Sequence, residues 1–256
     1  MTKEQRGIQS IDVGGRLLQA LAVSSGPMML KDIAMAAEMP PAKAHAYLVS
    51  FCKLGLMEQD AETGRYDLGA LSLQLGLASL NRLDAVKLAA HEMSELAERT
   101  GQSVAIAVWG NYGPTIVRYQ QSVRPIHINM RTGTVMSLTA TATGHVFAAF
   151  LPKNLVEAAL NATYGDTKQR AAVKKTLAGL DATLASVRKR GLARAEGYPL
   201  PGINAFSAPV FDHNGNIALA VTVLGPSAEF DASWDSTLAS ACLDSAGRVS
   251  VRLGAN

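Results

Sequence analysis

The chain has 256 residues, 48% of them hydrophobic, which is enough to bury a substantial core and predicts two domains. It contains no long apolar run, no signal-like start and only two cysteines, so we expect no membrane span, no disulfide framework and a reduced, cytoplasmic location. The net charge of +3 does not itself indicate DNA binding, because residues 1–80 carry seven basic and eight acidic side chains.

The first 56 residues have the pattern of three helices. Helical spacing of apolar residues predicts a first helix over Ile8–Val23 and a short second one beginning at Leu30. Pro40 and Pro41 break the second helix and suit the first turn of a third, which Gly55 is placed to end. Two short helices joined by a tight turn are typical of a helix-turn-helix, whose second helix can enter a DNA major groove.

The outer face of this third helix has no acidic residue, since none occurs between Glu38 and Glu58. Small, polar and cationic side chains of this kind can approach phosphates without electrostatic repulsion. An ordinary surface helix in a bundle is the alternative explanation. The side chains predicted to lie in or beside the groove, or to neutralise phosphates, are Lys43, His45, Tyr47, Ser50 and Lys53.

A predicted hairpin follows, with strands at Leu56–Gln59 and Arg65–Leu68 and a turn containing Gly64. A helix-turn-helix followed by a hairpin is the winged form of the motif. Arg65 would then contact a phosphate or the minor groove, or else it is simply a solvated turn residue.

A connecting helix is predicted over Leu68–Leu80, with leucines around much of its circumference. So much apolar surface needs a partner, which is either the rest of the chain or a second copy.

From Asp84 the pattern predicts a larger α+β domain with a mostly antiparallel sheet. Its strands and helices do not alternate regularly, which argues against a Rossmann fold. The predicted strands are Ser103–Trp109, Thr115–Gln121, Ile126–Met130, Leu192–Glu196, Ala205–Phe211 and Ile217–Leu224. The predicted helices are Ala85–Arg99, Thr141–Leu151, Leu155–Leu160, Gln169–Arg190 and Ser233–Leu253.

The chain resembles the IclR family of bacterial transcriptional regulators along nearly its whole length. The resemblance is carried by the winged helix-turn-helix and then, in order, by GRYDLGALSLQLG (64–76), LTATATGH (138–145) and PGINAFSAPVFDHNG (201–215). It implies a DNA-binding domain over residues 1–68, a connecting and dimerisation helix over 69–83, and a GAF/profilin-like effector-binding domain over 84–256. It also implies operator DNA and a small carboxylate effector as partners of a homodimer or a dimer of dimers.

Residues 138–144 have small side chains and lead into a helix, so the backbone N–H groups at its N-terminus are open to an anion. The alternative is that Thr139 or Thr141 simply caps the helix, and capping and anion binding can also occur together. Carried over from the family, the residues around the effector are Thr141, Ala142, Thr143, Ala195, Ile203, Ala205, Thr222 and Leu224.

Several positions depart from the family pattern. His145 stands where Lys is usual, Ala205 where Cys is frequent, and Ala46 where Arg is common in the recognition helix. With Ala195 and Ala205 lacking polar groups, and with Trp109, Met136 and Phe206 available as apolar walls, we hypothesise an aromatic carboxylate as effector.

No catalytic, metal or cofactor site is predicted. The five histidines and two cysteines have no metal-ligand spacing, and no nucleophile or phosphate-binding motif is present. A small-molecule hydrolase or isomerase on the C-terminal domain is the main alternative function, and a scaffold that binds protein through the leucine-rich connector is a weaker one.

Overall fold

The computed structural model describes residues 7–122, 130–163 and 167–255. The chain forms two compact units, residues 1–83 and residues 84–256. In the described part of the chain, no helix is both long enough and apolar enough to cross a membrane.

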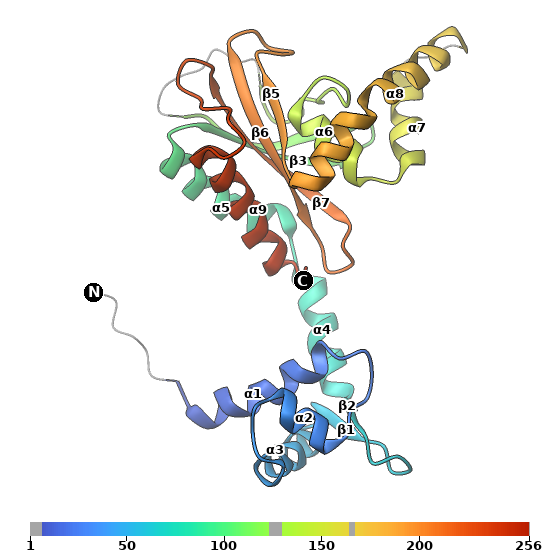
Figure 1. The fold of residues 1–256 in the computed structure, drawn as a ribbon, viewed down its shortest axis with the longest axis vertical. Helices are drawn as coiled ribbons and strands as arrows, with labels where there is room; N and C mark the ends of the chain where they lie inside the picture. The colour runs from blue at the N-terminus through green and yellow to red at the C-terminus, as the bar shows by residue number, and fades with distance from the viewer. Residues whose placement is uncertain (1–6, 123–129, 164–166, 256) are drawn as a thin grey trace. The chain divides into compact units, whose positions relative to one another are not determined.

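The first unit contains the predicted winged helix-turn-helix (Figure 1). Its core is formed by buried residues from its first three helices and both strands, and its large members include Leu17, Ile33, Leu48, Met57 and Tyr66. Its elements are α1 (Gln9–Ala22), α2 (Leu30–Ala36), α3 (Pro41–Leu54), β1 (Met57–Gln59), β2 (Tyr66–Leu68) and α4 (Ala70–Arg82).

The boundaries of α3 follow from its end residues. Pro40 is extended, with φ −62° and ψ 140°, and Pro41 occupies the first helical position, where a missing N–H costs no hydrogen bond. Gly55 ends the helix with φ 75°, a left-handed conformation that favours glycine.

The second unit contains one antiparallel five-stranded sheet in the order β4-β3-β7-β6-β5, which confirms the predicted α+β class. Its strands are β3 (Ser103–Gly110), β4 (Gly113–Gln120), β5 (Ala193–Glu196), β6 (Ile203–Phe211) and β7 (Ile217–Pro226). Most of the predicted strand at 126–130 lies outside the described residues, and the one described residue there, Met130, is not in a strand.

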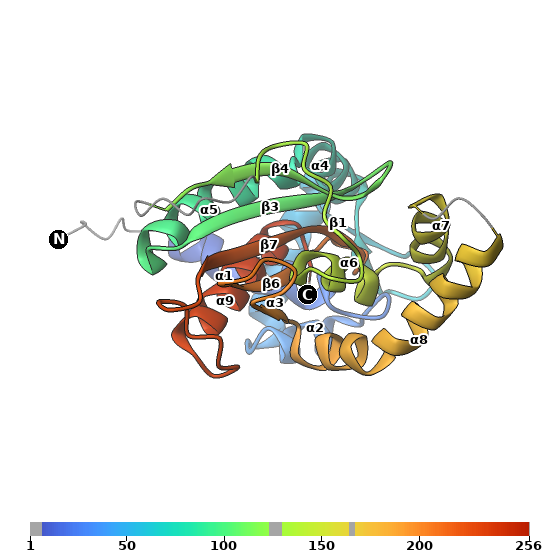
Figure 2. The same ribbon diagram turned by 90° about the horizontal axis from the view of Figure 1, so that it is seen from above.

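Helices cover the two faces of the sheet. α5 (Ala85–Thr100) and α9 (Thr237–Arg252) pack together on one face, and α6 (Ala142–Phe150) packs on the other. α7 (Lys153–Thr163) and α8 (Thr167–Arg190) lie beside one another next to α6, at the opposite end of Figure 2 from α5 and α9. α9 begins four residues later than expected because the Ser236 hydroxyl caps it, accepting a hydrogen bond from the Ala239 N–H at 3.2 Å.

Candidate functional site

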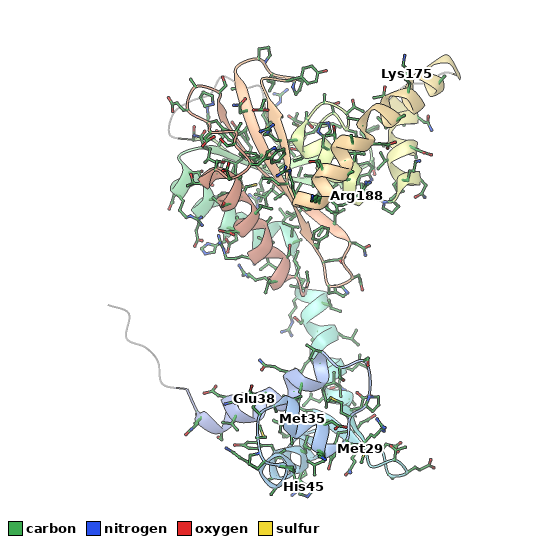
Figure 3. The ribbon with its side chains drawn as sticks, viewed as in Figure 1. Met29, Met35, Glu38, His45, Lys175 and Arg188 are labelled. Atoms are coloured by element: carbon green, nitrogen blue, oxygen red, sulfur yellow. The ribbon has the colours of Figure 1, made fainter. Side chains whose placement is uncertain are left out.

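The outer face of α3 exposes four of the five side chains predicted there. Lys43, His45, Ser50 and Lys53 are all exposed, and Figure 3 shows His45 at the edge of the first unit. The Ser50 hydroxyl donates to the Ala46 carbonyl at 3.1 Å, so its lone pairs remain available to a donor. This face therefore presents cations and small polar groups without an acid.

Tyr47 does not lie on that face. It is half-buried against α1, where a Cβ atom added to Gly14 would come within 2.9 Å of the Tyr47 ring and 3.0 Å of the Phe51 ring. The two rings also contact one another, with centroids 6.5 Å apart. Tyr47 therefore packs α3 against α1 and is less accessible than the four exposed side chains, and its place beside the groove stays a prediction.

Arg65 lies at the end of the wing turn, directly before β2, and is tied to the chain before α2. Its Nη1 donates to the Pro27 carbonyl at 3.0 Å, although the side chain is exposed. The turn itself is held by Asp60, whose carboxylate accepts from the Thr63 N–H at 2.6 Å and the Thr63 hydroxyl at 2.7 Å. These bonds lower the pKa of Asp60, so the wing turn carries a firmly ionised acid.

A cavity of about 320 Å³ opens at the N-terminal end of α6, against β5, β6 and β7. Its lining is mostly apolar and contains no charged side chain among the described residues. Nine of the eleven side chains expected around an effector line this cavity: Met136, Thr141, Ala142, Thr143, Ala195, Ile203, Ala205, Thr222 and Leu224.

The other two expected residues lie elsewhere. Phe206 is sealed on the opposite face of the sheet, its ring centroid 5.4 Å from Phe230 and 6.1 Å from Trp234, because neighbours on a strand point to opposite faces. Trp109 packs on Phe147 at 5.9 Å and does not reach the cavity lining. The apolar-wall expectation is therefore corrected for both residues.

Two further lining segments contain residues that were not predicted individually from the sequence. One is Met130 with Thr134, Val135 and Ser137, and the other is the turn Tyr198–Leu200 before β6. Neither has a helical or strand repeat, so periodicity gave no signal. A proline-rich segment directly before a cavity-forming strand was the available hint.

The first turn of α6 forms the polar end of the cavity. The Thr141 hydroxyl oxygen accepts from the Gly144 N–H at 2.9 Å and its proton goes to the Ser137 carbonyl at 2.7 Å. Within the described residues, the N–H groups of Ala142 and Thr143 have no hydrogen-bond partner. Two residues that line an apolar hollow at a helix N-terminus therefore carry unpaired backbone donors, an arrangement suited to an anion.

Segment 137–138 crosses directly over this turn. A Cβ atom at Gly144 would overlap the Ser137 carbonyl oxygen, so only glycine allows the crossing. A chain of buried hydroxyls continues from the turn into the sheet, with Thr143 and Thr222 oxygens 2.8 Å apart and Ser207 and Thr222 oxygens 2.9 Å apart. The cavity end is thus fixed by steric fit and by hydrogen bonds.

His145 lies one turn further along α6 but does not line the cavity. Its Nε2 lies 3.1 Å from the Thr139 carbonyl, which can only accept, so Nε2 carries a proton. Its Nδ1 is buried without a partner in the described residues, and burial lowers the pKa of the ring. Without a carboxylate partner and away from the cavity, His145 is not arranged as a catalytic base.

Two family models match the chain. The model of the bacterial transcriptional regulator IclR C-terminal domain matches residues 77–251, and that of the IclR helix-turn-helix domain matches residues 10–61. The crystal structure of Pseudomonas aeruginosa HmgR is similar with a TM-score of 0.82 and 36% identity, covering 97% of this chain and 99% of that one.

Curated relatives agree with this result. The glycerol operon regulatory protein of Streptomyces griseus is 30% identical over 98% of both chains. The HTH-type transcriptional regulator BhcR of Paracoccus denitrificans is 25% identical over 97% of this chain and 88% of its own. These relatives are transcriptional regulators and not enzymes, which removes the hydrolase or isomerase alternative. The chain belongs to the IclR family of bacterial transcriptional regulators.

Proposed function

We propose that this regulator binds operator DNA through the outer face of α3 and senses a small aromatic monocarboxylate in the cavity beside α6. The observation that carries the proposal is that Ala142 and Thr143, whose N–H groups have no partner in the described part of the chain, line a mostly apolar cavity. A carboxylate held there would complete the helix N-terminus and gain from its dipole.

The composition of the lining favours a single negative charge and a flat body. No cation lines the cavity in the described part of the chain, so a second carboxylate would find no partner among those residues, and burying it unpaired would cost several kcal/mol. Ala195 and Ala205 leave room where bulkier residues would fill the space, and Ile203 and Leu224 offer apolar contact. A two-carbon acid would leave most of this apolar surface unused.

The partner proposed for α4 is a second copy of the chain. Its exposed leucines bury little within their own unit, and DNA reading by a dimer needs a twofold interface. We propose a homodimer, which can pair again on DNA, acting in the cytoplasm. These leucines are Leu73, Leu75, Leu77 and Leu80.

A thermal-shift panel tests the effector proposal. Benzoate, phenylacetate and cinnamate are compared with benzamide, which lacks the charge, with acetate, which lacks the ring, and with phthalate, which has a second carboxylate. We expect at least one aromatic monocarboxylate to raise the Tm, while its neutral, aliphatic and dianionic counterparts do not. A Tm increase with acetate or benzamide equal to that with the aromatic acids would contradict the proposal.

The same acid must then change operator binding. Coupling between two sites is typically about 1–3 kcal/mol, a change of about 5- to 150-fold in DNA affinity. Titrating operator DNA with and without the acid measures this coupling. An acid that binds tightly but leaves DNA affinity unchanged would not be the effector.

A further inference from the structure

A second hollow of about 490 Å³ lies between α6, α7 and α8 and shares no lining residue with the cavity at the start of α6. Its floor is apolar and well buried, formed by Ala148, Val156 and Leu184. Its walls carry charges of both signs, which the first cavity lacks. The hollow therefore suits a ligand of different chemistry.

Arg188, labelled in Figure 3, lies on the last turn of α8 and is oriented by one hydrogen bond to α6. Its Nε donates to the Ala149 carbonyl in the last turn of α6 at 2.6 Å. Since a guanidinium is planar, this one bond sets the direction of the two remaining nitrogens. Those nitrogens have no partner among the described residues, and Arg188 lines the hollow.

Asp181 lines the same hollow, seven residues earlier on α8. Seven residues are about two turns, or roughly 10 Å along the axis, so both side chains lie on one face of the helix. Within the described structure, no ion pair joins them, and Asp181 has no other partner. An anionic and a cationic group thus face one apolar floor without neutralising each other.

The other two charges in the walls already pair. Lys153 and Glu157, one turn apart on α7, lie 4.0 Å from each other. Among the described side chains that line the hollow, the groups outside any ion pair are therefore one carboxylate, Asp181, and one guanidinium, Arg188.

We propose that this cleft binds a free α-amino acid with an aliphatic side chain. The ligand carboxylate would pair with the two free guanidinium nitrogens of Arg188, and its ammonium group with the Asp181 carboxylate. Its side chain would lie on the floor formed by Val156 and Leu184. A simple anion or a simple cation satisfies only one of the two charges, so the cleft selects a zwitterion.

The test uses the full chain and the twenty proteinogenic amino acids in a thermal-shift assay, followed by calorimetric titration of L-leucine. Two analogues serve as controls: 4-methylpentanoate lacks the ammonium group, and 3-methylbutylamine lacks the carboxylate. We expect leucine or another aliphatic amino acid to bind at least tenfold more tightly than either analogue. The proposal is overturned if no amino acid binds, or if either analogue binds as well as its parent.

Two variants test whether the amino acid binds in this cleft. Asp181→Asn and Arg188→Gln should each weaken amino-acid binding by about tenfold or more, while Lys189→Gln, an exposed neighbour that does not line the hollow, should leave it unchanged. If Arg188→Gln fails to fold because α6 loses its hydrogen bond, Asp181→Asn still decides, since that side chain is exposed.

The first cavity supplies the remaining control. Ala142→Pro, which removes a donor there, should not alter amino-acid binding. If Ala142→Pro abolishes that binding while Asp181→Asn and Arg188→Gln keep it, the amino acid occupies the first cavity and the cleft proposal fails. Failure of the aromatic acids in the panel above would leave the cleft proposal untouched.

Discussion

The two faces of the C-terminal sheet use the same strands for opposite purposes. On the α9 face, Phe206 packs without solvent exposure against Phe230 and Trp234, and burial raises the pKa of the nearby Cys242 thiol to about 12. On the α6 face, the adjacent Ala205 and the hydroxyl of Thr222 leave a cavity. The comparison shows that alternating large and small residues along a strand can provide stability on one face and a binding site on the other.

The largest expected effect comes from removing a buried side chain from the α9 face of the sheet. Phe206→Ala removes a fully buried ring and should lower the free energy of unfolding by about 3–5 kcal/mol, since the transfer free energy is lost and a cavity remains. Urea denaturation measures the change. A decrease in the free energy of unfolding below about 1 kcal/mol would mean that the α9 face is loosely packed. The α9 face would then not be the face that stabilises the domain.

Filling the open face should have a different effect. Ala205→Leu adds volume in the cavity, so we expect a change in unfolding free energy of less than about 1.5 kcal/mol together with a tenfold or greater loss of effector affinity. Denaturation and calorimetric titration of one sample separate the two quantities. Strong destabilisation with intact binding would show that Ala205 is a core position and not a lining position.

Removing one backbone donor tests the polar end of the cavity. Thr141 is extended, with φ −110° and ψ 150°, and Ala142 is the first helical residue, so Ala142→Pro fits the backbone and removes the N–H, although its ring adds two carbons at the cavity wall. Losing one hydrogen bond to a charged group should weaken effector binding by about tenfold. Ala142→Ser keeps the donor and is the matched control. Equal affinities of the two variants for the carboxylate would contradict the anion site.

Sequence patterns predicted the regular elements and their exposed faces well. The start and end of α3 were predicted correctly, because Pro41 and Gly55 mark its two ends in the sequence itself. The partial burial of Tyr47 was not predicted, because it depends on the absence of a Cβ at Gly14, 33 positions away, and a local helical repeat carries no information about that contact.

The cavity was predicted mainly through the family resemblance. Neighbouring residues on a strand point to opposite faces of the sheet. Once Ala205 was placed in the cavity, this alternation alone would have placed Phe206 on the other face. The turn Tyr198–Leu200 carries no repeat, so its approach to α6 follows only from the folded chain. Residues brought together by irregular segments are the part of a site that sequence periodicity does not predict.

A smaller effect is expected on the DNA-binding side. Lys53 is exposed in the last turn of α3, and Lys53→Ala should weaken binding to all DNA sequences and reduce the salt-dependence slope by about 1. Ser50→Ala should instead change sequence preference, and Lys87→Ala, on the second unit, is the control for net charge. Titrations at several salt concentrations measure the slope. An unchanged slope for Lys53→Ala would mean that the outer face of α3 does not meet phosphates.

The smallest expected effect is a pH dependence on the α6 face. Burial lowers the pKa of His145 below its usual 6.5, so the folded chain takes up this proton less readily than the unfolded chain. Stability should therefore be full above pH 6.5, fall as the pH drops from there toward the lowered pKa, and level off below it. His145→Gln keeps a side-chain donor without titrating, so subtracting its unfolding free energy from that of the natural chain at each pH isolates the ring. A difference that grows as the pH falls would show that the ring is charged in the folded state, and Nδ1 would then need a partner that the α6 face does not supply.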